Sequence, residues 1–173
     1  MTDKEQCPQI TLRYITDGEQ IPEAKEIFLE YAQSLNFNLC FQSFEKELQE
    51  LLKRYAPPEG ALILADADGK TAGCVAMHRL DDDICEMKRL YVREAYRNLG
   101  LGKRLVEAVI TSGKKAGYKY IRLDTLSSME AAQRLYLSLG FYDIDPYVYN
   151  PLEGARYMEY KIDGKYNLSL KPF

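Results

Sequence analysis

Two glycines separated by one residue stand beside basic side chains in residues 94–105, EAYRNLGLGKRL. The glycines are Gly100 and Gly102, and Arg97 and Lys103 flank them between a strand-like run and a helix-like run. A helix start exposes unpaired backbone N–H groups, and glycine lets an anion approach them closely. The pattern therefore indicates a phosphate or other anion site, although a helix start with a solvated basic rim has the same composition.

Two familiar phosphate-binding motifs do not fit this turn. The nucleotide P-loop, Gly-x-x-x-x-Gly-Lys-Ser/Thr, needs a glycine where Arg97 stands and a hydroxyl residue where Arg104 stands. The dinucleotide motif, Gly-x-Gly-x-x-Gly, needs a third small residue where Leu105 stands. The pattern that remains is Arg-x-x-Gly-x-Gly, filled by Arg97, Gly100 and Gly102.

Apolar periodicity predicts the elements that must position this turn. Strands are expected at about 9–15, 61–67, 71–80, 84–92, 118–126, 141–144 and 155–162. Helices are expected at 21–35, at 43–55 with Ser43 as its cap, at 100–116, and at 127–140 with Ser127 or Ser128 as its cap. Residues 57–60, Pro-Pro-Glu-Gly, end the second helix.

The order of these elements predicts a mixed α+β fold. The strands at 61–67, 71–80 and 84–92 form an antiparallel meander, and the helix at 100–116 connects the last of them to a parallel strand. A ligand is expected at the carboxyl end of the crossover's first strand, beside the glycine turn. The length of 173 residues, without repeats or linker-like segments, favours a single domain over residues 1–173.

Composition argues against several classes of function. Lys and Arg total 23 against 26 Asp and Glu, a net charge of −3, so there is no basic footprint for nucleic acid. No apolar run is long enough to span a bilayer, and the polar N-terminus lacks the core of a signal peptide. The four cysteines lack metal-ligand spacing and are expected to be reduced thiols. We therefore expect a cytoplasmic protein with no metal, nucleic acid or membrane partner.

The stretch EMKRLYVREAYRNLGLGKRLVEAVI, followed by YIRLDTL and AAQRLYLSLGFYDI, resembles the GNAT superfamily of acetyl-CoA-dependent N-acetyltransferases. The resemblance covers Gly73 to Ile144, and the order of the preceding elements also fits. It implies a central mixed, largely antiparallel twisted sheet of about seven strands flanked by about four helices. It also implies an acyltransferase that uses acetyl-CoA. Within the superfamily, CEMKRLYV and PYVYNP resemble a bacterial branch that acetylates small molecules.

The resemblance assigns the glycine turn to the pyrophosphate of acetyl-CoA. Arg97 would belong to this cofactor site, and the pyrophosphate would be held mostly through the backbone N–H groups of Asn98, Leu99, Gly100, Leu101, Gly102 and Lys103. It also implies that Leu90, Tyr91 and Val92 pair by backbone with the pantetheine arm, like an added strand. The family often has a cofactor-contacting Asn where this chain has Met129, so the chain departs from the family pattern at this position.

Tyr136 stands at the family's tyrosine in LYLSLGF. The resemblance implies that its ring lies near the thioester sulfur, where its hydroxyl could donate a proton to the departing thiolate. The alternative is a core aromatic on a helix face.

Amine acetylation needs a group that takes a proton from the amine, and a carboxylate can do so. Glu86 stands four residues before Leu90, where the family often has Glu. Strand alternation predicts that Glu86, Lys88, Leu90 and Val92 share one face. Glu86 is therefore either the base or the partner of Lys88 in a structural ion pair. The only histidine, His78, is expected to be structural.

The acceptor pocket is expected between the first two helices and the loop DPYVYNP. Tyr147, Tyr149 and Asn150 could bind the acceptor there, or could belong to a solvated loop. The predicted reaction is direct transfer of acetyl from acetyl-CoA to a primary amine of a small molecule. A non-catalytic acyl-CoA-binding or sensing module, and acetylation of a protein or peptide amine, are the alternatives. The sequence names no acceptor and leaves a homodimer open.

Overall fold

The computed structural model describes residues 7–35, 38–39 and 41–162. Within them, seven strands form one sheet in the order β1-β2-β3-β4-β5-β7-β6. The strands are β1 (Ile10–Tyr14), β2 (Ala61–Ala67), β3 (Lys70–Arg79), β4 (Ile84–Val92), β5 (Tyr120–Leu126), β6 (Tyr142–Asp143) and β7 (Ala155–Lys161). All neighbouring strands are antiparallel except β4 and β5, so the predicted meander and the predicted parallel crossover are both confirmed.

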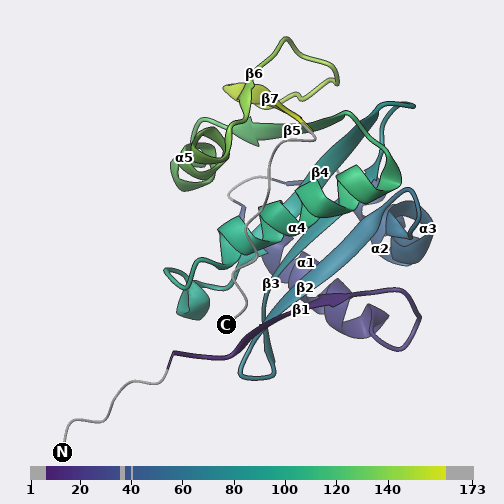
Figure 1. The fold of residues 1–173 in the computed structure, drawn as a ribbon, viewed down its shortest axis with the longest axis vertical. Coiled ribbons are helices and arrows are strands. Elements are labelled where there is room, and N and C mark those ends of the chain that lie inside the picture. Colours follow the sequence, from purple (N-terminus) through teal and green to yellow (C-terminus); the bar gives the residue numbers. More distant parts are fainter. Residues whose placement is uncertain (1–6, 36–37, 40, 163–173) are drawn as a thin grey trace, which may run out of the picture.

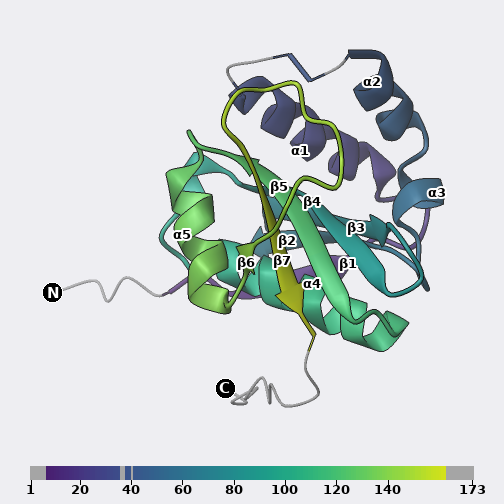
Figure 2. The same ribbon diagram turned by 90° about the horizontal axis from the view of Figure 1, so that it is seen from above.

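Helices cover both faces of the sheet (Figure 1). One face carries α1 (Ile21–Ser34), α2 (Phe41–Gln49) and α3 (Leu51–Tyr55), and the other carries α4 (Leu101–Ala116) and α5 (Glu130–Leu139), as Figure 2 shows from above. A short 3₁₀ helix, η1 (Glu94–Tyr96), joins β4 to the glycine turn. The sheet is therefore the middle layer of three, which confirms the predicted fold class.

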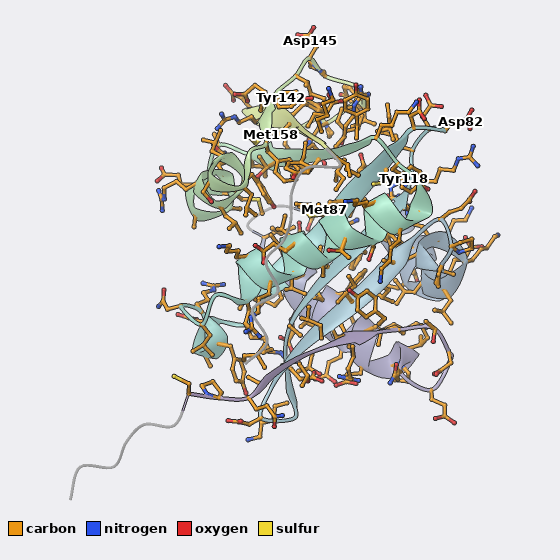
Figure 3. All side chains as sticks on the ribbon, in the orientation of Figure 1. Asp82, Met87, Tyr118, Tyr142, Asp145 and Met158 are labelled. Carbon is orange, nitrogen blue, oxygen red and sulfur yellow. The ribbon has the colours of Figure 1, made fainter. Side chains whose placement is uncertain are left out.

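Strand alternation divides the buried side chains between two cores. In β2, Leu62 and Leu64 pack on the α1–α3 side with Phe28, whereas Ile63 packs on the α4 side with Leu105. Every residue of β2 is buried, because helices cover both of its faces. Figure 3 shows two further members of the α4-side core, Met87 on β4 and Met158 on β7. In the same view, Asp82 and Asp145 lie at the outer tips of their loops.

The predicted helix caps are wrong at two places. Ser43 lies inside α2, which begins at Phe41, and the helix predicted at 43–55 is interrupted at Glu50. Glu50 has a φ of −118° and a ψ of 29°, outside the helical range, so α2 and α3 are separate helices. Helix α5 begins at Glu130, and the residue before it, Met129, makes no capping side-chain hydrogen bond.

The predicted face pattern along β4 is also wrong. Ala76 of β3 pairs with Lys88, but Cys74 pairs with Tyr91, so β4 has one extra residue in this interval. Such a bulge reverses the facing of every later side chain. Glu86 and Lys88 lie on the α1–α3 side opposite His78 and Ala76, whereas Leu90 and Val92 pack on the α4 side.

Strands β4 and β5 form a fork. Ile84 pairs with Tyr120, Cys85 with Ile121 and Glu86 with Arg122, and beyond Glu86 the described residues of the two strands no longer pair. In Figure 1 the strands begin side by side and separate along their length. The open end of the fork lies at the carboxyl end of the crossover's first strand, where a ligand was expected.

The described residues bear on two further expectations from the sequence. None of their helices has the length and apolar character needed to cross a membrane. Cys7 is an exposed free thiol, and Cys74 and Cys85 are buried free thiols. Cys40 lies outside the described residues.

Candidate active site

A cavity of about 380 Å³ lies in the fork between β4 and β5. Its walls come from separate parts of the chain: residues 87–90 of β4, residues 123–126 of β5, Met129, Ala132 and Tyr136 at α5, Tyr31 and Leu35 at α1, Asn38, Leu39 and Ser43, and residues 149–152 of the β6–β7 loop. Figure 2 shows this loop reaching across the sheet toward α1. The split sheet thus produces a hollow that helices and a loop enclose.

The glycine turn has the backbone geometry of an anion cradle. Asn98 has a φ of 69° and Gly100 a φ of 74°, so two residues of the turn take the left-handed conformation that glycine favours. The N–H of Arg104 makes the first helical bond of α4, to the carbonyl of Gly100, at 3.2 Å. The three preceding N–H groups therefore have no acceptor within the helix.

Exposed side chains give this turn a positive edge. Arg97 and Lys103 are exposed, and the Nε of Arg97 donates to the carbonyl of Val92 at 3.2 Å. Leu101 is only 1% exposed, so its side chain belongs to the core and only its backbone can serve the turn. The turn thus combines open N–H groups with positive charge, as an anion site needs.

The three residues predicted to pair with pantetheine lie in different surroundings. Leu90 lines the cavity. Tyr91 packs edge-on against the ring of Tyr31, with ring centroids 6.0 Å apart. Val92 packs against the α4-side core. What the three residues share is the position of their backbone, because all three lie in the part of β4 that follows its last pair with β5.

Tyr136 lines the cavity and packs in the core at the same time. It is 6% exposed, and its ring centroid lies 5.6 Å from that of Phe141. Within the described part of the chain, no hydrogen bond involves its hydroxyl group. Burial raises the pKa of Tyr136, with smaller contributions from Tyr31 and Asp124, so the hydroxyl holds its proton at neutral pH.

Glu86 lies at the centre of a buried polar cluster. It is 3% exposed and does not line the cavity. Its Oε1 lies 2.9 Å from the Nε2 of His78 and 3.4 Å from the Nζ of Lys88, and its Oε2 accepts from the hydroxyl of Tyr147 at 2.7 Å. Burial opposes ionisation, but these three partners lower the pKa of Glu86 to about 2.

The predicted acceptor residues separate into two groups. Tyr149 and Asn150 line the cavity, and Tyr149 is 90% exposed. Tyr147 does not line the cavity, because its hydroxyl donates to Glu86. Tyr147 and Asn150 both belong to the β6–β7 loop, and their hydrogen bonds to Glu86 on β4 and to Asp124 on β5 hold this loop to both strands of the fork.

Asp124 is a cavity residue that the sequence reasoning missed. Among the described residues, it is the one carboxylate in the cavity wall, and its Oδ2 accepts from the Nδ2 of Asn150 at 2.9 Å. Lys88 and Arg89 also line the cavity, but each lies beside a carboxylate, Glu86 and Glu47 respectively. The available signal was a charged residue near the carboxyl end of an apolar strand, in RLDTL.

Two further observations concern possible ligands. The hydroxyl of Thr125 donates to the Sδ of Met129 at 3.6 Å, and Met129 lines the cavity where the family often has Asn. Among the described residues, no three His, Cys, Asp or Glu side chains gather as a metal site would require.

Comparisons with known proteins identify the family. The model of the Acetyltransferase (GNAT) family matches residues 23–141. An uncharacterized N-acetyltransferase of Schizosaccharomyces pombe is 39% identical over 151 residues, covering 86% of this chain and 93% of that protein. One from Dictyostelium discoideum is 29% identical, covering 82% of this chain and 94% of its own. Both organisms are eukaryotes, so the comparisons do not tie the chain to the bacterial branch expected from the sequence.

Solved structures agree. A GNAT-family acetyltransferase of Staphylococcus aureus superposes with a TM-score of 0.74 and 25% identity, over 90% of this chain and 100% of its own. An acetyltransferase of Salmonella typhimurium, solved with its cofactor acetyl-CoA, superposes with a TM-score of 0.65 over 90% of this chain and 95% of its own, at 19% identity. The second likeness shows the fold alone. The family model spans most of the chain, and a relative matches nearly its whole length, so this protein belongs to the acetyltransferase (GNAT) family and is an acyltransferase.

Proposed function

We propose that this enzyme transfers the acetyl group of acetyl-CoA directly to a primary amine of a small molecule. The observation that carries the proposal is the cavity in the β4–β5 fork. A buried phenol, Tyr136, and a carboxylate, Asp124, both line this one cavity. Amine acetylation needs a proton donor for the departing thiolate and a proton acceptor for the amine, and these two groups can supply both.

The described residues fit acetyl-CoA at two places. Beyond Glu86, the edge of β4 that faces the fork is not paired with β5, so backbone groups of residues 90–92 can pair with an extended amide-bearing arm. The turn at residues 97–103 offers helix-start N–H groups and positive charge to a pyrophosphate. Acetyl-CoA supplies the acetyl group as an activated thioester.

In the proposed mechanism, Tyr136 acts as the general acid. The phenol is protonated at neutral pH, so its hydroxyl can donate toward the sulfur as negative charge develops there. A phenol in a largely buried wall interacts with such charge more strongly than it would in water.

Asp124 is the better candidate for the base than Glu86. Glu86 lies outside the cavity wall and is already engaged by His78, Lys88 and Tyr147, and a pKa near 2 makes it a weak base. Asp124 lines the cavity, and the hydrogen bond that it accepts comes from the neutral amide of Asn150. Its charge is therefore free to hold an ammonium group and to take its proton directly or through water.

The enclosure of the cavity supports a small acceptor. The loop that contributes residues 149–152 is fixed on both sides of the fork, and α1 contributes Tyr31 to the cavity wall. The exposed ring of Tyr149 offers a contact for the part of the acceptor that stays outside.

The test is release of free thiol by the purified protein with acetyl-CoA and a panel of amines. The panel should contain small mono- and diamines, amino acids, and short peptides with free N-termini. We expect turnover with at least one small amine. Turnover confined to the peptides would move the acceptor class to protein amines, and thiol release independent of any amine would contradict N-acetylation.

Asp124→Asn, with Glu86→Gln as the matched variant, separates the two candidate bases. With Asp124 as the base, Asp124→Asn should lower kcat/KM for the amine about 100-fold or more at neutral pH, and a rise in pH should restore part of it as free amine accumulates. Glu86→Gln should change it much less. The opposite ranking would return the role to Glu86.

A further inference from the structure

We infer that Arg89 and Glu47 form a positioning pair that holds the β4 bulge, and thereby holds the cofactor edge of the fork open. The inference rests on the proposed function only for the location of acetyl-CoA along β4. Neither residue is proposed to take part in the chemistry.

The bulge is centred on a residue whose backbone conformation is unfavourable. Arg89 has a φ of 62° in the middle of β4, a left-handed conformation that costs a non-glycine residue free energy. Arg89 and Leu90 together oppose the single residue between Cys74 and Ala76. A regular strand would remove this cost, so something must hold the bulge in place.

The side chain of Arg89 supplies that hold. Its Nε and Nη2 donate to the two carboxylate oxygens of Glu47 on α2, at 3.0 and 2.7 Å. The guanidinium also lies 5.7 Å from the ring centroid of Tyr31 and 5.3 Å from that of Phe44. Glu47 is buried and Arg89 is largely covered, with side-chain exposures of 3% and 12% respectively. A forked pair of this kind fixes orientation as well as distance.

Two further contacts fix the pair within the molecule. Glu47 accepts a second hydrogen bond at Oε1, from the hydroxyl of Tyr55 on α3, at 2.7 Å. The carbonyl of Arg89 accepts from the thiol of Cys74 on β3, at 3.3 Å. Arg89 is thus held by its side chain from the helical layer and by its backbone from the sheet.

The consequence is a link between the helices beside the acceptor and the strand beside the cofactor. The bulge turns Leu90 and Val92 toward the α4 side, next to the residues that precede the glycine turn. Without the pair, β4 would relax toward regular alternation, and the backbone of residues 90–92 would lose the placement that acetyl-CoA needs. Arg89 itself lines the cavity, so the pair joins α2 to the cavity wall.

The test compares Arg89→Gly with Arg89→Ala, each combined with Glu47→Gln. Glutamine keeps an acceptor for Tyr55 and avoids a buried lone carboxylate. The two double variants lack the same ion pair and differ in their preference for positive φ, which glycine adopts freely. CoA dissociation constants by calorimetry, KM for acetyl-CoA, and kcat would be measured together with thermal stability.

We expect the glycine variant to bind CoA about tenfold more tightly than the alanine variant, with KM following and kcat at saturation nearly equal. If the bulge persisted without the pair, the alanine variant would be less stable than the glycine variant but would bind CoA with the same affinity. Equal CoA affinities of the two variants would therefore overturn the inference. Should the alanine variant fail to fold, Glu47→Gln alone must bind CoA more weakly than the unaltered protein, and adding Arg89→Gly must restore binding; no restoration also overturns it. Failure of the unaltered protein to bind CoA would overturn the proposed function and this inference together.

Discussion

At the scale of single residues, Tyr136 gives the clearest test of the proposed chemistry. Tyr136→Phe removes only the hydroxyl and keeps the ring against Phe141. If the hydroxyl protonates the departing thiolate, kcat should fall about 100-fold while the CoA dissociation constant and the thermal midpoint stay nearly unchanged. Steady-state kinetics with an accepted amine, alongside calorimetry, would show this. Wild-type turnover by the variant would leave Tyr136 with a packing role only.

Glu86 predicts a pH dependence of stability. Its pKa falls from 4.5 to about 2 on folding, so the carboxylate contributes stability above pH 4.5 that is lost as the pH falls toward 2. Urea midpoints of the unaltered protein and Glu86→Gln should differ at pH 6, and the difference should shrink steadily between about pH 5 and pH 3. A difference independent of pH over this range would mean that His78, Lys88 and Tyr147 do not hold the carboxylate ionised.

The sequence predicted residue types better than residue neighbours. Four of the candidate site residues named from sequence motifs line the cavity: Leu90, Tyr136, Tyr149 and Asn150. A motif identifies positions along the chain, but it does not show which side chains lie next to one another. Asp124 was missed because a charged residue in a short apolar strand becomes meaningful only when β4 and β5 separate around it.

At the scale of elements, the start of α4 can be tested as an anion site. A Cβ at Gly102 would lie 3.2 Å from the Cδ2 of Leu135, so Gly102→Ala and Gly102→Asp share this contact. Aspartate in the first turn also favours the helix electrostatically, so its thermal midpoint should not fall below that of the alanine variant.

CoA affinity should nevertheless be at least about tenfold weaker for Gly102→Asp than for Gly102→Ala, because the added carboxylate repels the pyrophosphate. Added salt should reduce this difference in affinity. Calorimetry at two ionic strengths would measure both effects. Equal affinities would argue that the pyrophosphate does not lie at this turn.

The β2–β3 turn and the ends of α4 and α5 followed from local patterns, whereas the starts of α2 and α5, the break at Glu50 and the face of β4 did not. Asp68 and Gly69 mark the β2–β3 turn, and Gly117 and Gly140 end their helices with positive φ, as their residue types predict. The residue with positive φ in the bulge is Arg89 and not a glycine, so its residue type does not predict a bulge. It is held by Glu47, which is 42 residues away in sequence, so period-two reasoning along β4 could not detect it.

At the scale of the whole molecule, we propose that residues 1–173 form one cooperative domain. The two cores meet at the central strands, because adjacent residues of β2 belong to opposite cores. Loss of either core would expose the same strands, so neither layer of helices should unfold alone. Far-UV circular dichroism and the emission of the 14 tyrosines should therefore follow one urea transition.

Phe28→Ala on the α1 side and Leu105→Ala on the α4 side would test directly whether the two cores unfold together. Both side chains are fully buried, and such truncations typically cost about 2–5 kcal/mol of unfolding free energy. In a single domain, each variant should shift the entire transition, seen by both probes, to lower urea, although the two residues lie on opposite faces of the sheet. The Phe28 variant could instead show two urea transitions, with only the first shifted to lower urea. In that case the α1–α3 layer would be a separate unit. The acceptor side of the cavity could then open without disturbing the cofactor side, and the link through Arg89 would lose its structural basis.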